Sequence, residues 1–227
     1  MTQTFDSYDE SYGGAVQRSI EFSGLQHDFF LRAKIDVITA EVDRRFGSRS
    51  LDVLDVGCGV GALHPWLKQR FPRLHGTDLS EPCLAQARLH HPEVAYAACT
   101  PERLPYGDSA FDLLTASCVL HHVPVADRTG FAAELRRVVR PGGLVAIVEH
   151  NPFNPLTQLS VLRCPFDEDA VLLRAGSTEG LLKGAGFNRL RSEHFLLLPW
   201  EHRAARAVER TMRGLPFGAQ YVTFAAA

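Results

Sequence analysis

Short apolar runs alternate with amphipathic stretches along most of the chain. Leu51–Val56 is apolar and leads into glycines, a pattern typical of a strand buried on both faces. The expected strands are Leu51–Val56, Leu74–Thr77, Val94–Ala98, Phe111–Val119, Leu144–His150, Leu190–Leu198 and Tyr221–Ala225. The expected helices are Phe30–Phe46, Leu63–Phe71, Pro82–Leu89, Arg128–Val139, Ser177–Ala185 and Glu201–Arg213. This alternation predicts an α/β fold with a parallel, doubly wound sheet.

Two segments depart from the alternation. Residues 1–26 are polar and contain scattered aromatic residues, which predicts a mobile arm before the first helix. After His150, Pro152 and Pro155 prevent a continued strand, so we expect residues 151–175 to form an inserted lid. We therefore expect residues 1–50 to form an arm and a helix that cap the site, and residues 51–227 to form one domain carrying the lid.

Composition and charge narrow the range of partners and compartments. The 227 residues are 45% hydrophobic and 22% charged, and 24 Lys and Arg nearly balance 26 Asp and Glu, which argues against nucleic acid and anionic membranes as partners. The five cysteines contain no C-x-x-C pair, so we expect neither disulfides nor a metal site. Free thiols, together with the lack of a signal peptide or an apolar run of about 18 residues, predict a cytoplasmic protein without a membrane span.

A Gly-rich turn provides the strongest chemical signal. The sequence VLDVGCGVG, residues 53–61, passes from a strand into glycines that let the backbone turn sharply and let a ligand lie against bare peptide. Such turns also bind dinucleotides or serve packing alone. Asp55, however, stands two residues before the first glycine and would repel a pyrophosphate, while favouring an ammonium or sulfonium group. S-adenosylmethionine carries both cations.

An acidic residue also ends the second expected strand. Asp78 follows the turn by about twenty residues, the spacing at which a carboxylate accepts hydrogen bonds from both hydroxyls of an adenosine ribose. The alternative is that Asp78 begins a turn or caps the next helix. Ser80, two residues before Pro82, is the better cap, which favours the ribose role for Asp78.

Taken together, the motifs resemble those of class I S-adenosylmethionine-dependent methyltransferases. They are residues 53–61, residues 75–80, Leu104–Tyr106 with Ser109–Leu114, Leu120–Val123, and Leu135–Gly143. The similarity covers about residues 50 to 150 and is greatest to the branch that includes the ubiquinone and menaquinone biosynthesis methyltransferases. It implies a Rossmann-like, seven-stranded sheet in the order 3-2-1-4-5-7-6 with the last strand antiparallel.

The resemblance also implies which residues bind S-adenosylmethionine. They are Asp55, Gly57 and Gly59 at the methionine and ribose portion, Asp78 at the ribose hydroxyls, Leu79 at adenine, His121 near the methionine portion, and Tyr8 and Tyr12 in an arm that closes over the cofactor carboxylate. Where the family usually has an Asp and a backbone N–H donor for adenine, this chain has Thr100 and Pro101. Because proline lacks an N–H, we expect Thr100 to make the contact.

Methyl transfer from a sulfonium depends mainly on positioning the acceptor, and a base is needed only when the acceptor keeps its proton. His150 ends the fifth expected strand, at the edge where ligands bind, and we favour it as catalytic base over His122, His27 and Tyr12. Its alternative role is a hydrogen bond to the following loop. An arginine stripe, at positions 203, 206, 210 and 213, is either a solvated face or a dock for a phosphate-bearing acceptor.

These features predict an enzyme that transfers a methyl group from S-adenosylmethionine to an oxygen or nitrogen of a small-molecule acceptor, such as a sugar or a natural product. The sequence leaves the acceptor and the oligomeric state open. Two alternatives remain: a methyltransferase acting on RNA or protein, and an S-adenosylmethionine-binding protein that senses or catalyses something else.

Overall fold

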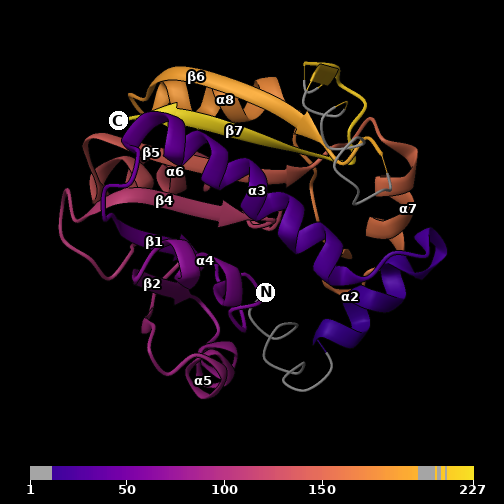
Figure 1. Cartoon of the computed structure of the whole chain (residues 1–227), viewed down its shortest axis with the longest axis horizontal. Helices are drawn as coiled ribbons and strands as arrows, with labels where there is room; N and C mark the ends of the chain where they lie inside the picture. Colours follow the sequence, from indigo (N-terminus) through magenta and orange to yellow (C-terminus); the bar gives the residue numbers. More distant parts are fainter. Residues whose placement is uncertain (1–11, 199–207, 209–210, 213) are drawn as a thin grey trace.

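The computed structural model describes residues 12–198, 208, 211–212 and 214–227, in which a central β-sheet lies between helices (Figure 1). The sheet has seven strands in the order β3-β2-β1-β4-β5-β7-β6. Its strands are β1 (Asp52–Val56), β2 (Arg73–Asp78), β3 (Ala95–Ala98), β4 (Phe111–Ser117), β5 (Val139–His150), β6 (Asn188–Phe195) and β7 (Gln220–Ala226). Only β7 runs antiparallel to its neighbours β5 and β6. The predicted Rossmann-like methyltransferase fold and strand order are confirmed.

Helices cover both faces of the sheet. They are α2 (Tyr12–Ile20), α3 (His27–Phe46), α4 (His64–Arg70), α5 (Glu81–His90), α6 (Arg128–Val138), α7 (Pro155–Arg163) and α8 (Ala175–Gly184), with short 3-10 helices η1 (Glu21–Ser23) and η2 (Pro165–Asp167). One apolar core joins the sheet to α3 and α4, and a second joins its other face to α6 and α8. The strands β1, β4 and β7 are buried along almost their whole length because both of their faces are covered.

The boundaries of two strands differ from the prediction. β4 ends at Ser117, because Cys118 has a φ of 59°, a left-handed conformation that interrupts an extended strand. β5 begins at Val139 and not at Leu144, so the Pro-Gly-Gly segment at 141–143 belongs to the strand. A register shift between Phe111 and Leu113 accommodates it, and Gly142 and Gly143 exchange backbone hydrogen bonds with Ala227.

The N-terminal segment and the lid segment pack on each other. Residues 12–23 of the predicted mobile arm form α2 and η1, because Ala15 packs against Cys164 and Phe166 of the segment that follows β5. In that segment, the Asn154 side chain accepts hydrogen bonds from the N–H groups of Leu156 and Thr157 and caps α7. The chain thus brings two distant segments together over the same end of the sheet.

Most of the expected helix at 201–213, including its arginines, and Tyr8 lie outside the described residues. Within the part of the chain that the structure describes, no helix is both long and apolar enough to cross a membrane.

Candidate active site

The Gly-rich turn after β1 adopts backbone conformations that favour glycine. Gly57 and Gly59 have φ values of 68° and 53°. A Cβ atom at Gly57 would lie 2.5 Å from a methyl carbon of Val119, whereas a Cβ atom at Gly59 would meet nothing within 4 Å. Gly57 is therefore needed for close packing as well as for its backbone angles, while Gly59 leaves its surroundings open to a ligand.

Asp78 is held against this turn at the end of β2. Its Oδ2 accepts a hydrogen bond from the Gly59 N–H at 2.8 Å, and its Oδ1 accepts one from the Ser80 N–H at 2.9 Å. Burial raises the pKa of Asp78, although these N–H groups oppose the shift. Ser80 caps α5, as expected, by accepting a hydrogen bond from the Cys83 N–H. The carboxylate is thus fixed in place with lone pairs left for a ligand.

Asp55 is more deeply placed than Asp78 and already has protein partners. Its side chain is buried; one oxygen accepts a hydrogen bond from Thr115 Oγ1 at 2.7 Å, and the other lies 3.2 Å from His64 Nε2. Asp55 lies at the cavity wall. In this arrangement its charge contributes to the local field, while its oxygens hold β1, β4 and α4 together.

A single cavity of about 920 Å³ extends over the carboxyl ends of β1, β2, β4 and β5. Its size lies at the upper end of the range for ligand pockets, so it has room for more than one small ligand. Toward β2 it is lined by Asp78, Leu79, Thr100 and Pro101. Leu79 is 45% exposed, which leaves an apolar surface beside the Asp78 carboxylate. This combination fits an adenosine group: a flat apolar base beside a ribose with two hydroxyl donors.

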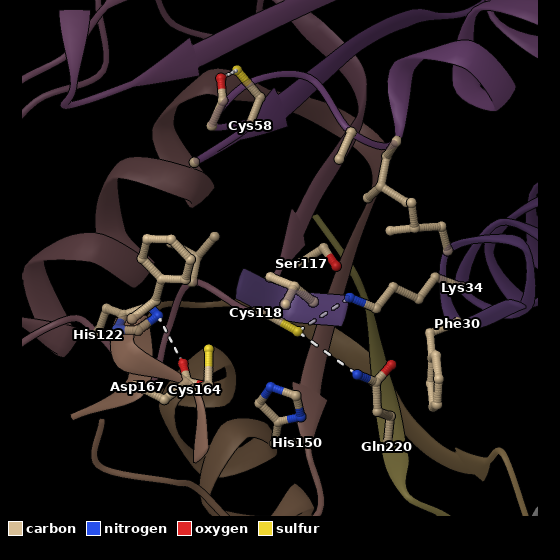
Figure 2. A pocket seen from close by; sticks show the side chains of 18 of the residues that line it. Phe30, Lys34, Cys58, Ser117, Cys118, His122, His150, Cys164, Asp167 and Gln220 are labelled. Atoms are coloured by element: carbon tan, nitrogen blue, oxygen red, sulfur yellow. Dashed lines mark hydrogen bonds and ion pairs between the residues drawn. The ribbon is translucent and has the colours of Figure 1, made fainter. Parts of the chain in front are cut away.

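The other end of the cavity, over β4 and β5, contains several polar side chains. Lys34 of α3, which is buried, donates a hydrogen bond to the Cys118 Sγ at 3.2 Å, and Gln220 of β7 reaches the same sulfur at 3.9 Å (Figure 2). Burial raises the pKa of the Cys118 thiol, but the charges of Lys34 and His150 outweigh it and lower that pKa to about 6. This end of the cavity therefore combines the Lys34 cation with a sulfur of thiolate character.

Two buried oxygens at this end lack a hydrogen-bond partner among the described residues. They are Oγ of Ser117 and Oε1 of Gln220, and both residues line the cavity. Gln220 is 5% exposed, so water from bulk solvent has little access to its amide. Because leaving a buried polar atom unpaired costs about 1–3 kcal/mol, these oxygens suit a ligand that carries hydrogen-bond donors.

His121, after β4, lies in a buried network of charges. Its Nδ1 is 2.5 Å from Glu149 Oε2, and its Nε2 is 3.3 Å from Asp167 Oδ1. Burial lowers the pKa of His121, but the two carboxylates outweigh it and raise that pKa to about 10. Glu149 also accepts a hydrogen bond from the Leu120 N–H at 2.7 Å. The network ties the ends of β4 and β5 to the lid segment.

His150 ends β5, lines the cavity and lies close to Cys118 (Figure 2). Its ring centroid is 5.2 Å from that of His121. His122 also lines the cavity, with Nε2 3.5 Å from Asp167 Oδ1. Burial and the charge of His121 lower the pKa of His122 to about 4, which keeps its ring neutral near pH 7.

Comparison with known proteins agrees with this architecture. The family model of a methyltransferase domain matches residues 54–147. An uncharacterized methyltransferase of Synechocystis is 32% identical over 143 residues, which cover 61% of this chain and 68% of that relative. The chain belongs to the class I S-adenosylmethionine-dependent methyltransferases.

Two further relatives of this methyltransferase differ in how much of the chain they match. A ubiquinone biosynthesis O-methyltransferase of Pseudomonas paraeruginosa is 37% identical, over 49% of this chain and 50% of its own length. A crystal structure of a methyltransferase of Thermotoga maritima, described as a possible histamine N-methyltransferase, is 17% identical with a TM-score of 0.73, and covers 100% of this chain and 99% of that one. This last likeness shows the fold alone. S-adenosylmethionine is the methyl donor of the family.

The structure brings most of the predicted site residues of the methyltransferase into one cavity. Those that line it are Asp55, Gly57, Gly59, Asp78, Leu79, Thr100 and His150. His121 does not line it; its ring lies behind the wall, 1% exposed, with Glu149. The backbone of Tyr12 begins α2, and its side chain is not among those described. Thr100 is exposed and its Oγ1 accepts a hydrogen bond from the Arg103 N–H.

Sequence reasoning missed four residues at the acceptor end of the methyltransferase cavity: Lys34, Cys118 as a charged group, Asp167 and Gln220. Each comes from a different element, and none lies in a recognisable motif. Lys34 occupies one position of a long amphipathic helix, where a lysine is ordinarily solvated. The only available signal was the position of Cys118 near the carboxyl end of an expected strand, because ligands bind at that edge of the sheet.

Proposed function

We propose that this methyltransferase methylates an oxygen or nitrogen of a small-molecule acceptor such as a sugar or natural product. The observation that carries the proposal is the division of one cavity into two chemically different ends. The end over β1 and β2 has the carboxylate and apolar surface that suit adenosine, and the end over β4 and β5 has unpaired polar groups. A donor and an acceptor bound at these two ends would lie side by side, because β1 pairs with β4.

In the cofactor half, we assign Asp78 to the ribose hydroxyls, Leu79 and Thr100 to adenine, and the turn containing Gly57 and Gly59 to the methionine portion. When bound, S-adenosylmethionine supplies a methyl group whose carbon–sulfur bond breaks with the electron pair remaining on sulfur, while the acceptor atom forms the new bond to carbon. Asp55 contributes a negative field that favours the sulfonium. Residues of α2, of α3 and of the segment 151–175 line the cavity, so a bound donor and acceptor would contact them.

In the acceptor half, we assign binding to Lys34, Ser117 and Gln220. The Lys34 ammonium donates to an acceptor oxygen, and the unpaired oxygens of Ser117 and Gln220 accept from its hydroxyl or amino groups. His150 lines the same end of the cavity, and we assign it to promoting loss of the acceptor's proton as the new bond forms. Apolar rings such as Phe30 line the same end, so the acceptor combines polar groups with an apolar body.

The test is incorporation of a methyl group by purified protein. A metabolite extract is incubated with S-adenosylmethionine carrying a labelled methyl group, and products are identified by a mass gain of one methylene and by the label. We expect a labelled small molecule that native protein forms and that His150→Ala forms much more slowly at saturating cofactor. Label recovered only in RNA or protein, or binding of S-adenosylhomocysteine with no labelled product, would contradict the proposal.

A further inference from the structure

Three side chains of metal-ligand type meet at the cavity wall over β4 and β5: His150 and Asp167 line the cavity, and His121 lies directly behind them. One donor atom from each of His121, His150 and Asp167 lies within 4.8 Å of the others. They come from three places in the chain: His121 follows β4, His150 ends β5, and Asp167 ends η2 in the lid segment. Two imidazoles and one carboxylate are a common donor set for a divalent transition-metal ion that keeps positions open for other ligands.

The His121 ring is oriented in the way that a metal-binding histidine needs. Glu149, which is fully buried, engages Nδ1 at 2.5 Å, and this contact directs Nε2 toward Asp167. In metalloproteins, a carboxylate bound to the far ring nitrogen fixes the tautomer and raises the basicity of the ligating nitrogen. Glu149 is itself held by the Leu120 N–H, so the ring has little freedom to turn away.

The spacing and the local charge also suit an ion. Ligand atoms of a tetrahedral zinc site, with bonds of about 2.1 Å, are about 3.4 Å apart, and His121 Nε2 lies 3.3 Å from Asp167 Oδ1. Two carboxylates, Glu149 and Asp167, face this ring from opposite sides. Further donors stand close by: His122 Nε2 is 3.5 Å from Asp167, and Cys164 lies beside the same carboxylate (Figure 2).

We propose that His121, His150 and Asp167 bind a divalent transition-metal ion of the zinc type, with Glu149 as the residue that positions His121. The role of this ion rests on the proposed function: it would bind an acceptor oxygen and favour release of its proton to solvent before the methyl group is transferred. His150 then acts as a ligand and not as the base. The proposal replaces the expectation of no metal site, which rested on the spacing of cysteines alone.

Metal binding is tested directly, without an acceptor. The full chain is freed of metal with a chelator, shown by circular dichroism to remain folded, and titrated with Co²⁺, whose visible absorption reports its coordination. We expect one Co²⁺ per chain, with absorption bands of a four- or five-coordinate ion, and displacement of Co²⁺ by Zn²⁺. Absence of these bands at saturating Co²⁺, or displacement only by a chelator and not by Zn²⁺, overturns the proposal.

Variants locate the ion. Asp167→Asn and His150→Gln nearly keep the size of each side chain. Each should weaken Co²⁺ binding by roughly 10–100-fold or more, because loss of a residue that only orients a ligand already costs that much. The matched control is His90→Gln, because His90 is exposed at the end of α5, and this variant should bind Co²⁺ like native protein. If His90→Gln abolishes the spectrum, or Asp167→Asn leaves it unchanged, the assigned ligands are wrong.

Two further measurements separate this proposal from the proposed function. The first is calorimetry of metal-free protein with S-adenosylhomocysteine. If the protein binds this compound but does not bind Co²⁺, the proposed function stands and the metal site is overturned. Once an acceptor is known, turnover distinguishes the two roles of His150. If His150 is a metal ligand, chelation and Asp167→Asn should both lower turnover, and Zn²⁺ should restore the turnover of the chelated native enzyme. Unchanged turnover after complete chelation overturns the role of the ion.

Discussion

The two ends of the cavity are built in different ways. Over β1 and β2, the site consists largely of backbone from one short turn, and its carboxylate, Asp78, is held by two N–H groups within about twenty residues. Over β4 and β5, it consists of side chains from α3, β4, β5, η2 and β7, including the buried Lys34 and Gln220. The contrast is what the proposed function expects, because a cofactor shared by a whole family can be bound by backbone, whereas a particular acceptor needs its own set of side chains.

The largest expected effect comes from a methyl group added to the turn. Gly57→Ala combines a left-handed φ with a Cβ 2.5 Å from a Val119 methyl carbon, and we expect it to lower the free energy of unfolding by about 2–4 kcal/mol. Gly59→Ala shares the left-handed φ but meets no neighbour, so it should cost only about 1–2 kcal/mol. Denaturant unfolding measures both. Equal losses would show that packing against Val119 does not matter.

Asp78→Ala should have the next largest effect, on cofactor binding. Hydrogen bonds to a charged group contribute about 1.5–3 kcal/mol each, so losing those to the ribose should weaken binding of S-adenosylhomocysteine by about 100-fold. Calorimetry measures the dissociation constant. Asp43→Ala is the control, because Asp43 pairs with Arg70 on the outside of α3 and does not line the cavity. Native affinity in Asp78→Ala would remove the ribose assignment.

Lys34→Met tests whether the end of the cavity over β4 and β5 is built for binding at a cost in stability. Lys34 is 7% exposed and its ammonium faces the Cys118 sulfur, so the cost of removing both groups from water offsets much of their attraction. We expect Met to stabilise the protein by about 1 kcal/mol, since the sulfur left behind can exist as a neutral thiol, and to weaken acceptor binding. Lys68→Met, at an ion pair on the surface with Glu93, should change stability by less than about 0.5 kcal/mol. A destabilised Lys34→Met would show that the buried ammonium is structural.

The smallest effect is a pH dependence of cofactor binding. Burial raises the pKa of Asp78 above its usual 3.8, with Asp55 contributing in the same direction. The ionised carboxylate accepts from the ribose hydroxyls and the protonated form has lost part of that capacity, so affinity should fall as pH is lowered through the raised pKa. Because only one proton is involved, the association constant cannot fall by more than about tenfold per pH unit. Calorimetry between pH 7 and acid should show it, and Asp78→Asn should be flat over the same range.

The fold was largely predictable because its signals are local. The alternation of apolar strands and amphipathic helices predicts a parallel sheet, and family resemblance implies its order, which is confirmed. The errors lie where contacts across the fold outweigh local signals: the Pro-Gly-Gly segment joins β5 because Gly142 and Gly143 bond to Ala227, far along the chain. In the same way, residues 12–23 form helices because Ala15 packs against the lid.

For the site itself, the sequence alone determined the cofactor end. Its turn, its glycines and Asp78 are neighbours along the chain, so their spacing already specifies how the backbone presents them to a ligand. Only the tertiary structure decided the end over β4 and β5, where residues 34, 118, 167 and 220 meet the predicted His150. The physical reason is that pairing of β4 with β5 and of β5 with β7, together with packing of α3 on the sheet, sets these distances.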